Sequence, residues 1–143
     1  MFLLDTNVIS ELRKAGEGRA NANVVAWLGS VDAAKLYLSS VTLLELEIGV
    51  LRIKRRDAAQ GARLHAWINN RILPEFVDRT LAIDTPVALR CARLHVPDAC
   101  SERDAFIAAT ALVHGMTVAT RNVADFKATG VRLLNPWEEF SVD

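Results

Sequence analysis

The chain has 143 residues and a mass of 15.7 kDa, which is the size of one ordinary domain. Hydrophobic residues make up 51% of it and charged residues 24%, a balance that is typical of a globular protein and excludes a disordered one. Its 17 basic and 17 acidic residues cancel. This argues against a protein that coats nucleic acid by bulk electrostatics, but it leaves room for a local basic patch beside an acidic pocket. We expect a single domain over residues 1–143.

The sequence contains no pattern that predicts a membrane segment or export. No apolar run approaches the ~18 residues that a membrane helix needs. The N-terminus has no basic segment and no small-residue cleavage site. The two cysteines, Cys91 and Cys100, have no metal-ligand spacing and suit a reducing compartment. We therefore expect a cytoplasmic protein.

Short apolar runs alternate with helical patterns along the chain. Strands are predicted over residues 2–4, 36–40, 81–83, 116–120 and 131–134. The first helix is predicted to begin at a cap at Thr6 or Asn7 and to end at a loop over 14–20, and the next two begin at Asn23 and at a cap at Thr42. A long helix over 56–72 is predicted to end at a break at Pro74. Further helices are predicted over 86–94, over 104–114 between Ser101 and Gly115, and as one turn over 122–126. In the helix after Thr42, Leu44, Ile48 and Leu51 are predicted to lie on one apolar face. The alternation predicts an α/β fold, with a parallel sheet between helices in three α/β/α layers.

Carboxylates are predicted to gather at one edge of this sheet. In open parallel sheets, the functional crevice lies outside the C-terminal ends of the strands. Asp5 directly follows the first strand, and Glu45 lies near the start of the helix after the second strand. Asp104 lies in the capping sequence of a later helix, and Asp125 lies in the single turn after the fourth strand. Each acid alone can be explained as a helix cap or as a partner of a helix dipole, but a common edge for all of them is harder to explain that way.

Glu47 competes with Glu45 for the second position. Glu45 shares a polar helical stripe with Gly49 and Arg52, whereas Glu47 shares its stripe with Leu51. Gly49 has no side chain and would let a substrate approach the helix one turn beyond Glu45. We therefore prefer Glu45.

Several carboxylates within a few ångströms of one another repel and raise one another's pKa. A divalent cation with oxygen ligands is the natural counter-charge. Since no histidine or cysteine accompanies these acids, Mg²⁺ or Mn²⁺ is favoured over zinc. Such an ion orients and acidifies a water molecule for in-line attack on a phosphate. The pattern therefore predicts hydrolysis of phosphodiester bonds.

Four segments, in chain order, resemble the motifs of PIN-domain ribonucleases. They are Leu3–Ser10, Ser39–Val50, Arg103–Ala111 and Val118–Phe126. The closing Leu134–Trp137 is also typical, and the match spans almost the whole chain. The resemblance is to the toxin branch, the VapC and FitB type of bacterial type II toxin–antitoxin modules. It implies a Mg²⁺-dependent endoribonuclease built on a five-stranded, mainly parallel sheet.

The resemblance also implies roles for individual residues. Asp5, Glu45 and Asp104 match the three acids that ligate Mg²⁺ in the family. Some members carry a fourth acid at the position of Asn122, and Asp125 lies one turn further along the same segment. We expect Asp125 to be a peripheral or water-mediated ligand. The residues expected to support the site are Thr6, beside Asp5 or a metal-bound water, and Asn122 and Thr120, which would orient the water at Asp125.

Partners are implied as well. They are an RNA substrate, a second copy of the chain in a homodimer, and a small DNA-binding antitoxin of the VapB or FitA type. The antitoxin's extended tail would wrap the toxin in a hetero-oligomer. A basic helix end offers Arg52, Arg55 and Arg56 as RNA contacts, and the alternative for the same residues is a solvated helix end.

Two other functions stay open from the sequence. One is a non-catalytic binding module with a PIN-like fold, against which the intact Asp5, Glu45 and Asp104 argue. The other is a phosphatase of the haloacid-dehalogenase type, in which an Asp also ends the first strand. That chemistry needs a second Asp two residues on, where this chain has Asn7.

Overall fold

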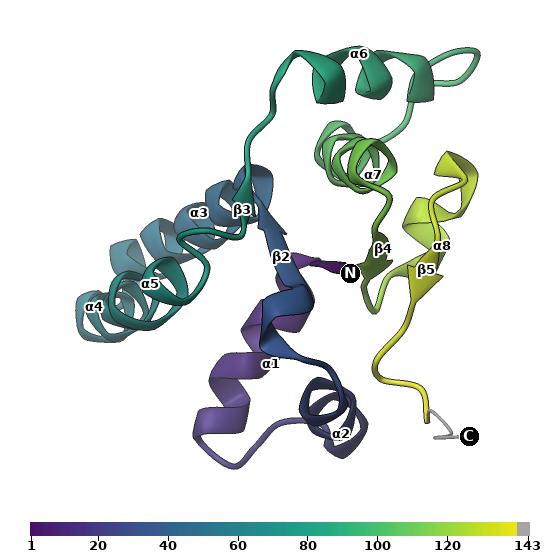
Figure 1. Ribbon diagram of the computed structural model, residues 1–143. Helices are drawn as coiled ribbons and strands as arrows, with labels where there is room; N and C mark the ends of the chain where they lie inside the picture. The colour runs from purple at the N-terminus through teal and green to yellow at the C-terminus, as the bar shows by residue number, and fades with distance from the viewer. Residues whose placement is uncertain (140–143) are drawn as a thin grey trace.

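The computed structural model describes residues 1–139 and contains a five-stranded parallel sheet in the order β3-β2-β1-β4-β5 (Figure 1). The strands are β1 (Phe2–Leu4), β2 (Leu36–Ser39), β3 (Thr80–Leu81), β4 (Thr117–Ala119) and β5 (Leu133–Leu134). The predicted parallel sheet is confirmed, and each predicted strand overlaps an observed one. Residues 140–143, the end of the predicted domain, lie outside the described part of the chain. Because β1 lies in the centre, the residue that follows it lies in the middle of the sheet edge.

Helices fill the intervals between the strands. The α-helices are α1 (Thr6–Gly16), α2 (Ala22–Ser30), α3 (Ser40–Arg56), α4 (Ala58–Trp67), α5 (Leu73–Glu75), α6 (Thr85–Leu94), α7 (Glu102–His114) and α8 (Val123–Phe126). Two 3-10 helices, η1 (Ala33–Lys35) and η3 (Lys127–Thr129), and a π-helical turn, η2 (Ile68–Ile72), accompany them. The predicted helix end at Gly115 is confirmed, and its φ of 67° is the left-handed conformation that glycine readily adopts. Within residues 1–139, no helix is long and apolar enough to cross a membrane.

Alternate strand residues point to opposite faces of the sheet and build two cores. Leu3 and Leu4 are both fully buried, but Leu4 packs with α1, α2 and the hairpin of α3 and α4, whereas Leu3 packs with α7. A third cluster joins α6 to the outer side of α7. Figure 1 shows α1 and α2 on one side of the sheet and α7, covered by α6, on the other. The predicted three α/β/α layers are therefore confirmed.

Helix α1 starts and ends differently from the prediction. Its N-cap is Asp5, whose carboxylate accepts the Thr6 N–H at 2.8 Å, so the predicted caps at Thr6 and Asn7 are wrong by one or two residues. The helix runs through Gly16 and shortens the predicted loop over 14–20. Ion pairs three and four residues apart stabilise its last turns, one of them to the buried Glu11, and the hydrophobic pattern does not show this contribution.

Helix α3 begins earlier than predicted. The Ser39 hydroxyl accepts the Val41 N–H at 3.1 Å and caps the helix, so the predicted cap at Thr42 is wrong. Thr42 is fully buried instead, and its hydroxyl has no hydrogen-bond partner among residues 1–139. The last residue of β2 therefore also starts the helix, which leaves no loop between the two elements.

The face of α3 that packs on the sheet is not the predicted one. Val41, Leu46 and Val50 are buried, whereas Leu44 and Leu51, which belong to the predicted apolar face, are each 50% exposed. Because α3 carries apolar residues on more than one face, periodicity alone does not decide which face is buried. The position of the cap and the packing of α1 and α4 decide it.

The predicted helix over 56–72 is wrong at both ends. Asp57 separates α3 from α4 and caps α4 with its carboxylate. Beyond α4, the Leu73 N–H donates to the Ile68 carbonyl in a π-helical turn, and the chain continues into α5. Pro74 does not break this segment, because it lies in the first turn of α5, where a missing N–H is tolerated.

The close approach of α3 and α4 gives a test of this packing. A Cβ on Gly61 would lie 2.6 Å from the Lys54 Cα, so α4 would have to move. We expect Gly61→Ala to lower the free energy of unfolding by about 1–3 kcal/mol in urea denaturation. Gly49→Ala is the matched control, since nothing lies within 4 Å of the added methyl group. It should raise the free energy of unfolding by about 0.5–1 kcal/mol through helix propensity. Equal effects of the two substitutions would contradict the helix contact.

Candidate active site

The predicted acids lie at the C-terminal edge of the sheet. Asp5 follows β1, Glu45 lies on the helix that follows β2, and Asp125 lies in α8 after β4. Helix α7 ends where β4 begins, so its first turn, which holds Asp104, returns to the same edge. This is where open parallel sheets bind their ligands.

Asp5 is the buried centre of the site, with only 6% of its surface exposed. Its backbone N–H donates to the Ala119 carbonyl at 2.9 Å, at the end of β4. One carboxylate oxygen accepts the Thr6 N–H and the other accepts the Thr120 hydroxyl, both at 2.8 Å. Burial raises the pKa of Asp5, and these two hydrogen bonds lower it in part. The carboxylate is thus fixed in place from two strands and a helix.

Asn7 joins the ends of β1 and β4, a role that the sequence did not reveal. Its amide nitrogen donates to the Asp5 carboxylate and to the Thr120 hydroxyl, both at 3.4 Å. Its oxygen accepts the Arg121 N–H at 3.3 Å. The only signal in the sequence was its position two residues after Asp5, at the start of the same helix. Asn7 therefore holds the first acid and the end of β4 together.

Glu45 reaches the site from the second turn of α3. Its Oε1 accepts the Thr6 hydroxyl at 3.0 Å, and its Oε2 lies 3.9 Å from Nη1 of Arg103 on α7. Burial is the main cause that raises the pKa of Glu45, and the charge of Asp5 raises it further. Thr6 therefore binds both acids, Asp5 through its N–H and Glu45 through its hydroxyl.

The competing acid, Glu47, lies on another side of α3. Its carboxylate is 3.2 Å from Nε2 of His65 on α4. The structure thus brings Glu45, and not Glu47, to the sheet edge. The predicted helix phase is wrong for the apolar residues of α3, but the choice between these two acids agrees with the geometry.

The pKa of Asp104 is affected by the charges of the other acids. Asp104 is half-buried in the first turn of α7. Its pKa is raised from 3.8 to about 6, first by burial and then by the charges of Asp5, Asp125 and Glu45, while a hydrogen bond with Ser101 lowers it. Acids from four different segments of the chain therefore act on one another here.

Helix capping does not explain the two later acids. Ser101 and Asn122 are the N-caps of α7 and α8, but neither side chain accepts a capping hydrogen bond. Asn122 donates its backbone N–H to the Thr120 hydroxyl at 3.0 Å instead. The capping box that could have accounted for Asp104, and the similar motif before Asp125, are not formed.

The donor set fits a hard divalent cation. Its four acids offer only carboxylate oxygens, and the pKa values of three of them are raised, first by burial and then by the charges of the other acids. Among residues 1–139, no three Asp, Glu, His or Cys side chains are already closed around one point as a metal-binding group. Mutual repulsion favours such spread carboxylates, and a cation that neutralises them favours their approach.

The predicted RNA contacts lie away from the acids. Arg52, Arg55 and Arg56 are exposed at the far end of α3. At a rise of 1.5 Å per residue, they stand roughly 10–16 Å along the helix from Glu45. The structure therefore does not bring these arginines together with the acids.

Comparison with known proteins agrees with this geometry. The family model of the PIN domain matches residues 2–131. The chain belongs to the PIN domain family. Toxin FitB of Neisseria gonorrhoeae is 40% identical over 148 residues, which cover 97% of this chain and 100% of FitB. VapC ribonuclease Y4jK of Sinorhizobium fredii is 38% identical over 146 residues, which cover 96% of this chain and 99% of Y4jK. A chain in the structure of FitAB bound to an IR36 DNA fragment matches with a TM-score of 0.87 at 38% identity, over 99% of both chains. The predicted family and its fold are thus confirmed.

The burial of Asp104 and the repulsion by the other acids should both affect the measured stability of the protein. The pKa of Asp104 is about 6 in the folded chain against an ordinary 3.8, so the unfolded chain loses this proton first as the pH rises. Wild-type stability therefore falls between about pH 4 and pH 6 through this group. Asp104→Asn should raise the free energy of unfolding of the metal-free protein by about 1 kcal/mol near neutral pH, after allowance for partial exposure. In scanning calorimetry the gain should shrink towards zero as the pH falls to about 4. A gain that does not depend on pH would contradict this origin.

Proposed function

We propose that the chain is a Mg²⁺-dependent endoribonuclease and the toxin component of a type II toxin–antitoxin module. The observation that carries the proposal is the acid cluster, in which the pKa of Asp104 rises to about 6 beside Asp5, Asp125 and Glu45. Clustered carboxylates of this kind bind hard cations. The full-length similarity to a protein named a toxin and to one named a ribonuclease supports the same activity.

In this proposal, Asp5, Glu45 and Asp104 hold Mg²⁺, and the same oxygen donors would accept Mn²⁺. An ion held there would supply positive charge for the phosphate and would acidify a water molecule for attack on phosphorus. Asp125 acts from α8 as a peripheral, water-mediated ligand, with Asn122 beside it. The assignment of Asp125 rests on its charge, which acts on both Asp5 and Asp104.

The two threonines position carboxylates. Thr6 binds Asp5 and Glu45 at once, so it sets the separation of two ligands. The Thr120 hydroxyl donates to Asp5 and accepts the Asn122 N–H. Since its proton is engaged, we assign Thr120 to holding Asp5 and not to the water-orienting role expected from the sequence.

Arginines outside the acid cluster are suited to the RNA backbone. Arg103, with 47% of its side chain exposed, stands beside Glu45 and offers a guanidinium to a phosphate at the acids. Arg52, Arg55 and Arg56 offer further contacts at the end of α3. Binding of the RNA and reaction of the phosphate are thereby carried by separate side chains.

We propose a small DNA-binding antitoxin of the VapB or FitA type as the partner, and a homodimer that assembles with it in the cytoplasm. The related FitAB was solved bound to a DNA fragment. A cluster of carboxylates attracts a guanidinium, which can bind two acids at once. An arginine of the antitoxin's tail would therefore compete with Mg²⁺ for Asp5, Glu45 and Asp104. The exposed Leu44 and Leu51 of α3 offer apolar surface for such contacts.

Two neighbouring glutamates give a matched test of the proposed chemistry. Glu45→Gln should reduce Mg²⁺-dependent cleavage of a fluorescent RNA by at least ~100-fold, because it removes a metal ligand. Glu47→Gln should stay within a few-fold of wild type, because Glu47 faces His65. Asp104→Asn should abolish cleavage while the circular dichroism spectrum stays unchanged. Equal losses for the two glutamates, or an active Asp104→Asn protein, would overturn the assignment of the metal ligands. A wild-type chain that cleaves no RNA would favour a non-catalytic module.

Growth of a bacterial host gives a second test. Expression of the wild-type chain should arrest growth, and co-expression of the small protein encoded beside it should relieve the arrest. Asp5→Asn should be harmless at the same protein level, because asparagine still caps α1 but is a poor metal ligand. Arrest by Asp5→Asn, or arrest that the neighbouring protein does not relieve, would contradict the toxin–antitoxin assignment.

A further inference from the structure

A continuous groove runs between α1 and the hairpin of α3 and α4. Its narrow part, of about 140 Å³, lies between α1, α3 and α4. Its wide part, of about 620 Å³, lies between the second half of α1 and α4. Arg13, Leu64 and Trp67 line both parts, so the two hollows adjoin. We call the whole the α1–α4 groove.

The narrow part of the α1–α4 groove begins next to the acids. Ser10 and Gly49 line it, and each lies one helical turn beyond a residue of the site, Thr6 on α1 and Glu45 on α3. Gly49 keeps this passage open, since nothing lies within 4 Å of the place where a Cβ would be. The end of the groove therefore lies about one helical turn from Thr6 and Glu45.

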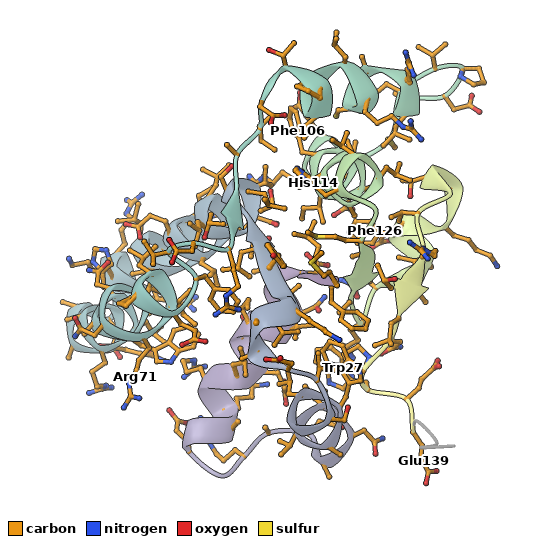
Figure 2. The ribbon with its side chains drawn as sticks, viewed as in Figure 1. Trp27, Arg71, Phe106, His114, Phe126 and Glu139 are labelled. Carbon is orange, nitrogen blue, oxygen red and sulfur yellow. The ribbon has the colours of Figure 1, made fainter. Side chains whose placement is uncertain are left out.

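The wide part is cationic, although the protein as a whole is neutral. It is lined by Arg13, Arg19, Arg63 and Arg71 and by one acid, Glu17. Glu17 pairs with Arg13 at 3.6 Å and with Arg19. Neither Arg63 nor Arg71 forms an ion pair within residues 1–139. Figure 2 shows Arg71 reaching outward at the lower left, beyond the helices of the hairpin. Two exposed guanidinium groups are thus uncompensated here.

Trp67 forms the wall that the two parts share. It is half-buried and packs against the core that contains Ile68 and Ile72, so its position is fixed. A fixed aromatic ring beside exposed arginines is the combination with which proteins hold single-stranded nucleic acid, through base stacking and phosphate contacts. In a duplex the bases stack on one another, so no base is free to stack on the ring of Trp67.

We propose that the α1–α4 groove binds a single-stranded segment of the RNA next to the phosphate that is cut. Arg63 and Arg71 contact its phosphates, and Trp67 stacks on a base. The inference rests on the proposed ribonuclease function and deepens it. Along α1 the groove extends roughly 10 Å, from Ser10 to Glu17, at a rise of 1.5 Å per residue. The chain therefore selects RNA that is unpaired on this side of the cut.

Binding of a fluorescent single-stranded RNA to the Asp104→Asn protein tests the groove without cleavage. In this background, Arg63→Gln with Arg71→Gln should weaken binding by about tenfold at about 0.1 M salt. The slope of log Kd against log salt should fall by roughly 1.4, which is 0.7 for each lost contact to a single strand. The matched control is Arg90→Gln with Arg93→Gln, which removes the same charge from exposed positions of α6, on the other side of the sheet. It should leave Kd and slope unchanged.

Kinetics with the cleavage-competent chain give a second readout. Arg63→Gln with Arg71→Gln should raise KM for a single-stranded RNA by about tenfold and leave kcat within about twofold, because uniform binding is lost while the acids are untouched. A hairpin RNA without unpaired residues beside the cut should show no such change in KM. A fall in kcat with an unchanged KM would overturn the inference.

The outcomes separate this inference from the proposed function. If the wild-type chain cleaves no RNA, the proposed function fails, and the binding assay still decides the groove. If the groove variant (Arg63→Gln with Arg71→Gln) and the α6 control (Arg90→Gln with Arg93→Gln) bind RNA with equal affinity, the groove inference is wrong even if the wild type cleaves RNA. If only replacement of Arg52, Arg55 and Arg56 weakens binding, the RNA follows the end of α3 and the inference is wrong. It is also wrong if the groove variant keeps RNA binding and loses binding of the antitoxin.

Discussion

The buried carboxylate of Asp5 is the interaction on which the rest of the site depends. It ends the central strand, caps α1 and accepts the Thr120 hydroxyl from the end of β4, so a single side chain ties two strands to a helix. A carboxylate that is 6% exposed lowers stability unless hydrogen bonds or a cation stabilise its charge. The hydrogen bonds compensate in part, since the pKa of Asp5 is still raised. The charge of Asp5 is thus only partly compensated within the chain, which agrees with the proposed role of this carboxylate as a metal ligand.

Charge is segregated in this protein in a way that its zero net charge conceals. The acids lie together at the sheet edge, where the pKa of Asp104 is about 6. The wide part of the α1–α4 groove is lined by four arginines and by only one acid. The acids of the proposed metal site and the arginines of the groove thus occupy separate parts of the molecule. Such an arrangement suits a polyanion that is held along its backbone and attacked at one phosphate, because attraction along the groove offsets repulsion at the acids. A uniformly basic protein would bind RNA but would lack the acids that the reaction needs.

The parts that the sequence predicted well depend on neighbours along the chain. The apolar run before Asp5 makes a buried strand, and parallel pairing then brings the acids after each strand to one edge, so the site follows from local patterns and topology. The hydrogen bonds of Asn7 to Thr120 and Arg121 were not predictable, because they join residues more than a hundred positions apart. The groove was hidden for the same reason. The groove forms only because α4 folds back on α3. The sequence pattern predicted one helix from residue 56 with a break at Pro74. In the structure, Asp57 is the boundary between α3 and α4, and a π-helical turn follows α4.

The error on α3 is itself informative. A helix with one apolar face is predicted correctly by periodicity, and α3 was not, because it carries a second apolar face in addition to the buried one. Leu44 and Leu51 remain 50% exposed after the sheet is covered, which is surface that a monomer does not need. Leu44 also precedes Glu45 directly in the sequence, so this face begins beside a proposed metal ligand. A protein partner that covers it lies within one helical turn of the acids. Access to the site can then be blocked by contact alone, and inhibition requires no rearrangement of the fold.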